Sequence, residues 1–81
     1  MAELDLEVIR KEIDKVDRQL AAILEARLGL VMRVAEYKKA KGMPVKDKAR
    51  EVKVVEKVTG FLDNKDYVPA VETIMHSIMD A

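Results

Sequence analysis

The chain has 81 residues, with 15 lysines and arginines against 15 aspartates and glutamates, no cysteine and only three aromatic residues. This balance gives no net field to attract nucleic acid or an anionic membrane, and a chain without cysteine has neither disulfides nor thiolate metal sites. A chain of this length is one domain at most and would bury little surface alone, so we expect a partner chain.

The N-terminal residues, MAELDLEVIRKEID, lack the basic start and the apolar core of a signal peptide. No apolar run in the sequence approaches the length of a membrane span. We therefore expect a cytoplasmic protein.

Apolar residues recur every three or four positions from about residue 4 to 41, which predicts one long packed helix. Its apolar stripe consists of Ile9, Ile13, Val16, Leu20, Ile23, Leu30, Val34 and Tyr37. Arg27 breaks the pattern, because it stands where the periodicity requires a hydrophobic residue. We expect the helix to end at KGMP, where Gly42 suits a C-terminal cap and Pro44 prevents continuation.

Two shorter helices are predicted after this point. Asp47 is expected to cap a helix at about 48–62, and a third helix is expected at about 67–81 with Pro69 in its first turn. The positions predicted on their buried sides are Val54, Val55, Val58, Phe61, Leu62, Val71, Ile74, Met75 and Ile78. No segment alternates as a strand does, so we predict an all-α fold in a single domain, residues 1–81.

The length of the first helix favours a homodimer. A helix of about 37 residues is about 55 Å long, whereas the two later helices together cover about 45 Å. Much of the apolar stripe would stay exposed in a monomer. We therefore predict an entwined homodimeric bundle in which two long helices pack together.

Charged residues near this apolar stripe point to a ligand. No acid occupies positions 23, 24, 30 or 31, the helical neighbours of Arg27. Lys38 lies eleven residues after Arg27, which places it within about 20° of the same helix face and about 16 Å further along the axis. The long side chains of Arg27 and Lys38 could close this distance around a small anion. In the second helix Glu51 lies on the apolar side and Arg50 stands beside it. Together these residues predict a pocket for a small molecule with negative groups and a hydroxyl.

Each of these charges also has an ordinary structural interpretation. Arg27 could extend its charged end to solvent or pair with an acid of another helix. Lys38 belongs to a YKKAK run typical of a solvated helix end, and Asp47 is better explained as a cap than as a ligand contact. His76 has no second histidine to share a metal, and Ser77 has no triad pattern around it. We expect no metal and no cofactor.

The order of these residues resembles the all-helical class of chorismate mutase. In that pattern an Arg and I-D-x-x-D are followed by a second Arg, a Lys and P-V-x-D-x-x-R-E, and this chain has them in register from Arg10 through Arg27 and Lys38 to Glu51. The segments are IRKEIDKVDRQLAAILEAR and VAEYKKAKGMPVKDKARE, about half the chain. From Val52 onward the chain is similar in helix pattern and in its late V-E-T-I-M segment.

The resemblance implies conversion of chorismate to prephenate in phenylalanine and tyrosine biosynthesis. This Claisen rearrangement breaks an ether bond while a carbon–carbon bond forms, and it needs no nucleophile and no proton transfer. By position, Lys38 would lie at the ether oxygen, and Arg27 and Arg10 would bind the two substrate carboxylates. Further contacts implied are Arg50 near a carboxylate, Glu51 and the backbone at Asp47 near the ring hydroxyl, and Val34 in the pocket lining.

Helix geometry adds that Arg10 is about 25 Å from Arg27 along the same helix and roughly 100° around it. That separation is too large for one small substrate within a single chain, so we expect Arg10 to come from the other subunit, as in the entwined family dimer. The family's third helix continues into a Ser and then a Gln, which we expect to lie beyond Ala81.

Two alternatives remain open at the level of sequence. Isochorismate pyruvate lyase has the same fold and a similar pocket, although Glu51 and the PVKDKARE loop look more like the mutase. A helical dimerisation or regulatory module without catalysis would explain the apolar stripe equally well, and it would tolerate Leu or Gln in place of Arg27 and Lys38.

Overall fold

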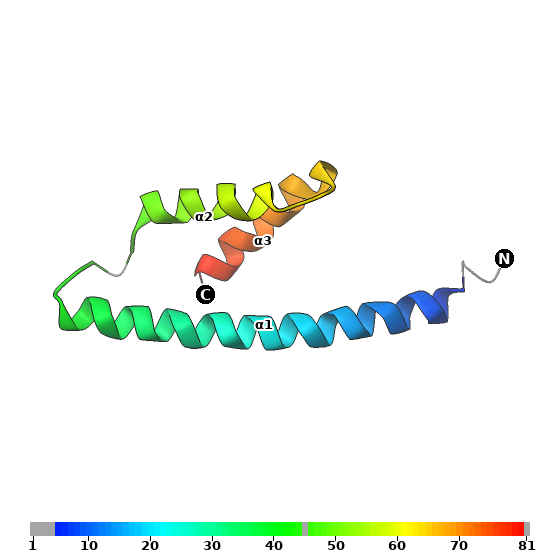
Figure 1. The fold of residues 1–81 in the computed structure, drawn as a ribbon, viewed down its shortest axis with the longest axis horizontal. Coiled ribbons are helices and arrows are strands. Elements are labelled where there is room, and N and C mark those ends of the chain that lie inside the picture. Colours follow the sequence, from blue (N-terminus) through cyan, green and yellow to red (C-terminus); the bar gives the residue numbers. More distant parts are fainter. Residues whose placement is uncertain (1–4, 45, 81) are drawn as a thin grey trace. The chain divides into compact units, whose positions relative to one another are not determined.

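A computed structural model describes residues 5–44 and 46–80 and consists of helices and turns (Figure 1). Its elements are α1 (Leu6–Ala40), α2 (Lys48–Gly60), a 3₁₀ helix (Lys65–Tyr67) and α3 (Val68–Asp80). These two ranges contain no strand, so the predicted all-α fold of one long and two shorter α-helices is confirmed. The helix ends expected near residues 4 and 81 lie outside the described residues.

The chain divides into two compact units, Met1–Val45 and Lys46–Ala81. The first unit contains α1 and the second contains α2, the 3₁₀ helix and α3. In the part of the chain that the structure describes, no helix is both long and apolar enough to cross a membrane.

The first turn of α1 is fixed by a capping aspartate. The carboxylate of Asp5 accepts a hydrogen bond of 2.9 Å from the backbone N–H of Glu7. This bond satisfies one of the N–H groups that have no partner within the helix, and the acidic Glu7 side chain complements the positive end of the helix dipole.

The last turn of α1 ends as the sequence predicts, at Gly42. This glycine has φ of +67°, a left-handed conformation that side chains other than glycine rarely adopt. The N–H of Met43 donates to the carbonyl of Lys38 at 2.8 Å and the N–H of Gly42 to that of Lys39 at 3.3 Å. These two bonds form a Schellman motif, which satisfies the last carbonyls of the helix.

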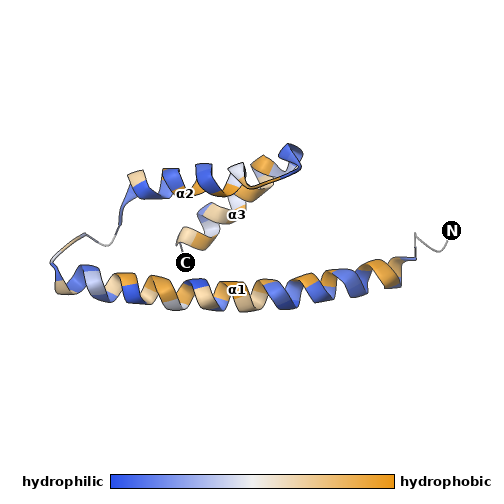
Figure 2. Cartoon of the chain, in the orientation of Figure 1, coloured by the Kyte–Doolittle hydropathy of each residue, from blue (hydrophilic) through white to orange (hydrophobic). Residues whose placement is uncertain are grey.

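The apolar stripe of α1 is not covered within the first unit. None of the described residues of α1 is buried, and the side chains of the stripe range from 41% exposed at Ile9 to 63% exposed at Ile23. Hydrophobic residues, orange in Figure 2, are interspersed with hydrophilic ones along this helix. Hydrophobic burial inside the first unit therefore contributes almost nothing to its stability.

The second unit has a small core between two helices. Val55 of α2 and Met75 of α3 are its buried side chains among the described residues, at 7% and 9% exposed. Half-buried side chains extend this core on both helices: Val54, Val58, Leu62, Val71 and Ile78. The ammonium group of Lys65 donates to the carbonyls of Thr59 and Gly60, both at 3.3 Å, and so caps the C-terminal end of α2.

Two of the positions expected on buried sides are exposed. Phe61 is 72% exposed, because α2 ends at Gly60 and Phe61 is its C-cap residue, beyond the last helical turn. Ile74 is 55% exposed, because the buried face of α3 is centred on Met75 and includes Val71 and Ile78. The assignment of Phe61 and Ile74 to the buried faces was therefore wrong for the single chain.

We expect Gly42→Ala to lower the free energy of unfolding by about 1 kcal/mol, because alanine pays a steric penalty at positive φ. Gly29→Ala is the matched control. A Cβ at Gly29 meets no atom within 4 Å and the residue is helical, so the same change should raise the free energy of unfolding by up to about 1 kcal/mol. Urea denaturation of both variants measures the difference, and equal effects at the two positions would contradict the Schellman assignment.

Candidate active site

α1 positions two of the predicted cations on one face. The helix is unbroken from residue 6 to residue 40, so Arg27 and Lys38 are about 16 Å apart along its axis and within about 20° around it. Both side chains are half-buried in the chain. Among the described residues no ion pair involves Arg27, as expected from the lack of acids at its helical neighbours.

Lys38 lies in the last turn of α1, where its carbonyl accepts the Met43 N–H of the Schellman motif. The motif fixes the backbone from which the Lys38 side chain extends. The position of this cation therefore depends on the glycine four residues further along the chain.

An open hollow of about 370 Å³ lies on the apolar stripe of α1, towards the C-terminal end of the helix. Its lining residues are Leu30, Arg33, Val34 and Tyr37. Val34, which was predicted to line the substrate pocket, is therefore at a concave part of the surface. Arg33 is a cation in this hollow that the sequence analysis did not single out.

The N-terminal turn of α2 brings three predicted residues together. The carboxylate of Asp47 accepts a hydrogen bond of 3.0 Å from the N–H of Arg50, and its carbonyl accepts one of 3.1 Å from the N–H of Glu51. The prediction that Asp47 caps this helix is confirmed. The Arg50 side chain is exposed and Glu51 is half-buried, so a cation and a carboxylate project from adjacent positions of the same turn.

An ion pair connects the N-terminal end of α2 to the C-terminal end of α3. The ammonium group of Lys46 is 3.7 Å from the carboxylate of Asp80. Within the second unit the end of α3 therefore lies beside Asp47, the capping residue of α2. The sequence analysis missed this pair, because no local pattern relates two residues so far apart in the chain.

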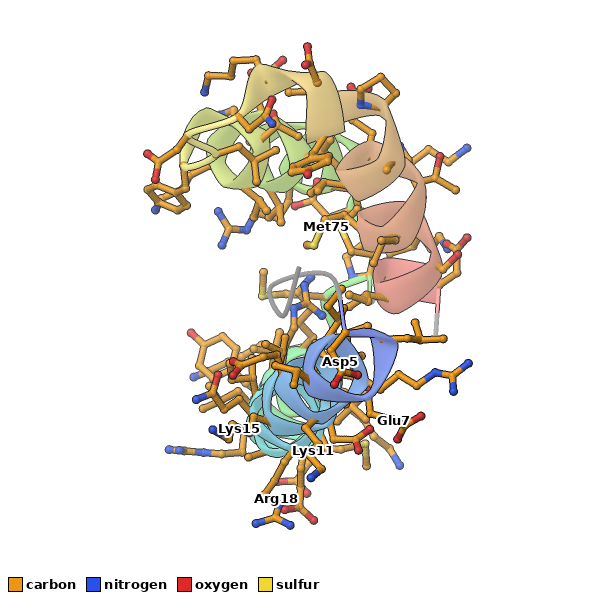
Figure 3. All side chains as sticks on the ribbon, turned by 90° about the vertical axis from the view of Figure 1, so that its right-hand side faces the viewer. Asp5, Glu7, Lys11, Lys15, Arg18 and Met75 are labelled. Carbon is orange, nitrogen blue, oxygen red and sulfur yellow. The ribbon has the colours of Figure 1, made fainter. Side chains whose placement is uncertain are left out.

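Arg10 is placed near the other end of α1. Its guanidinium donates to the carboxylate of Glu7 at 3.1 Å. Arg10 is about 25 Å from Arg27 along the helix, so the first unit does not bring these two arginines together. Figure 3, viewed towards the N-terminal end of α1, shows Glu7 in the first turns, with Lys11 and Arg18 projecting away from the helix.

These residues make up two groups of charges. Arg10, Arg27 and Lys38 belong to α1 with Val34, and Asp47, Arg50 and Glu51 belong to the first turn of α2. Residues 5–44 and 46–80 contain no group of three or more acidic or histidine side chains able to bind a metal ion. The structure therefore defines an all-helical protein whose predicted site residues lie on the long helix α1 and in the first turn of α2.

Comparison with known proteins gives the family. Residues 9–81, and thus both units, match the family model of chorismate mutase type II. A curated relative, a bifunctional chorismate mutase/prephenate dehydratase of Aquifex aeolicus (strain VF5), is 33% identical over 54 residues, which are 67% of this chain. The chain belongs to the chorismate mutase type II family. The aligned segment spans 15% of the length of the Aquifex relative. No solved structure matches this chain.

Proposed function

We propose that this chain is a chorismate mutase, an isomerase that rearranges chorismate to prephenate in phenylalanine and tyrosine biosynthesis. The observation that carries this proposal is the family match over residues 9–81, which includes every residue that we assign to the site. The name of the bifunctional relative includes chorismate mutase, and the segment aligned with it, which is 33% identical, covers 67% of this chain.

The proposed chemistry requires cations and a compact substrate conformation. As the ether bond of chorismate breaks, negative charge grows on the ether oxygen, and a cation fixed beside it lowers the barrier. Lys38 has this role in our proposal, and Arg27 binds a substrate carboxylate. Their common face on one rigid helix supports these roles, because a preorganised pair of charges needs little rearrangement during the reaction.

The first turn of α2 contributes the remaining contacts from this chain. We assign Arg50 to a substrate carboxylate, Glu51 and the backbone at Asp47 to the ring hydroxyl, and Val34 of α1 to the pocket lining. The hydrogen bond that the Arg50 N–H donates to the Asp47 carboxylate supports this assignment, because the cap fixes the turn from which the Arg50 and Glu51 side chains extend.

The enzyme acts as an entwined homodimer in this proposal. The 35 residues of α1 span about 52 Å, and its stripe is exposed over that whole length, as expected for a surface that a second copy covers. Arg10 then completes the pocket of the partner subunit, since it is too far from Arg27 to share a ligand within one chain. We also propose a cytoplasmic location, with which a chain without cysteine is compatible.

We expect Lys38→Ala to reduce the turnover of chorismate by about a hundredfold or more, because a preorganised charge at the developing oxyanion typically has an effect of that size. The decrease in chorismate absorbance measures turnover for the parent and the variant. Lys39→Ala is the matched control, since it removes the neighbouring, exposed lysine of the same turn and should keep nearly the parent activity.

A parent chain that neither consumes chorismate nor releases pyruvate from isochorismate would exclude both enzymatic functions. Pyruvate release without prephenate formation would replace the mutase by the lyase. A loss below about tenfold in Lys38→Ala would remove Lys38 from the role at the ether oxygen.

Arg27→Leu tests whether the arginine in the apolar stripe serves the ligand. We expect the melting temperature of the dimer to stay equal or to rise, because leucine completes the stripe, whereas KM for chorismate should rise at least about tenfold on losing a charged hydrogen bond. Arg18→Leu, at an exposed arginine of the same helix, should leave KM unchanged. A large fall in melting temperature for Arg27→Leu would instead indicate a structural ion pair.

A further inference from the structure

The two arginines of α1 that we assign to substrate carboxylates differ in their surroundings within the helix. Arg27 has no acid at the positions three or four residues away, whereas Arg10 has Glu7 on one side and Asp14 on the other. The structure pairs Arg10 with Glu7, with 3.1 Å between guanidinium nitrogen and carboxylate oxygen. Arg27 therefore has no carboxylate partner in its own helix, whereas Arg10 already has one.

We infer that Glu7 competes with the substrate carboxylate for Arg10 and so lowers the affinity of the pocket for chorismate. This inference rests on the proposed function, in which Arg10 binds a substrate carboxylate. Glu7 is not among the residues assigned to the site: it lies in the first turn of α1 and acts through Arg10 alone.

Competition outweighs any preordering of Arg10 by Glu7. The two side chains are 61% and 71% exposed, so water screens the pair and it restrains the guanidinium only weakly. An ionised carboxylate at 3.1 Å nevertheless occupies one donor of the guanidinium and places a negative charge beside the position that a substrate carboxylate must take. The occupied donor and the nearby negative charge thus both weaken the binding of a dianionic substrate.

The backbone gives Glu7 a fixed starting point for this contact. Its N–H donates to the carboxylate of the cap residue Asp5, at 2.9 Å, which fixes the first turn of the helix. Spacing of three residues then places the Glu7 side chain on the same face as Arg10. The pair is therefore a property of the helix itself and does not need the rest of the molecule.

Glu7→Gln keeps the size of the side chain and removes its charge. In the full 81-residue chain we expect KM for chorismate to fall about two- to fivefold, the range that corresponds to an exposed ion pair, with kcat unchanged because Glu7 contacts no reacting atom. Raising the sodium chloride concentration to about 1 M should bring the KM values of parent and variant together, because salt screens an exposed pair.

Glu12→Gln is the matched control. It removes the same charge from the same helix, two residues from Arg10, a spacing at which side chains do not face each other, and among the described residues Glu12 forms no ion pair. A KM for Glu7→Gln that is unchanged or higher, or an equal fall in Glu12→Gln, would overturn the inference. These outcomes require an active parent, so they are distinct from failure of the proposed function, which is an inactive parent.

Discussion

The length of α1 is the constraint on which the account of this protein depends. A helix of 35 residues exposes an apolar stripe along about 52 Å, and the described part of its unit contains no side chain that covers it. The second unit has a core centred on Val55 and Met75, which is small for a chain of this size. A stable protein therefore needs further apolar burial, and a second copy of the long helix supplies it in the proposed dimer.

The exposed stripe of α1 also bears on the arginines that stand on this helix. A cation at the stripe is costly when its partner is another protein charge in a dry interface, and it is useful when the partner is an anionic ligand. Our proposal treats Arg27 as the second case, and its own helix offers no acid three or four residues away. Arg10 differs because its guanidinium forms an ion pair with Glu7. In the competition that we infer, this pair makes Arg10 less available than Arg27 to a substrate carboxylate.

Sequence reasoning succeeded where the physical signal is local. The caps at Gly42 and Asp47 follow from backbone requirements of a few neighbouring residues, and the structure confirms both. Phe61 was misplaced because periodicity does not show where a helix stops. The ion pair between Lys46 and Asp80 depends on the packing of two helices, which no spacing rule describes. The charged residues proposed for the site followed from the family resemblance together with spacing, and their roles remain proposals.

Refolding a mixture of two inactive variants tests most directly whether each pocket is built from two chains. Arg10→Ala and Lys38→Ala homodimers should both be nearly inactive, since every pocket lacks one cation. When the two variants are refolded together in equal amounts, about half of the dimers should be heterodimers. Each heterodimer has one doubly altered pocket and one intact pocket. About a quarter of the parent activity should then return. Activity that stays at the level of the separate variants, with heterodimers verified by mass spectrometry, would contradict the shared pocket.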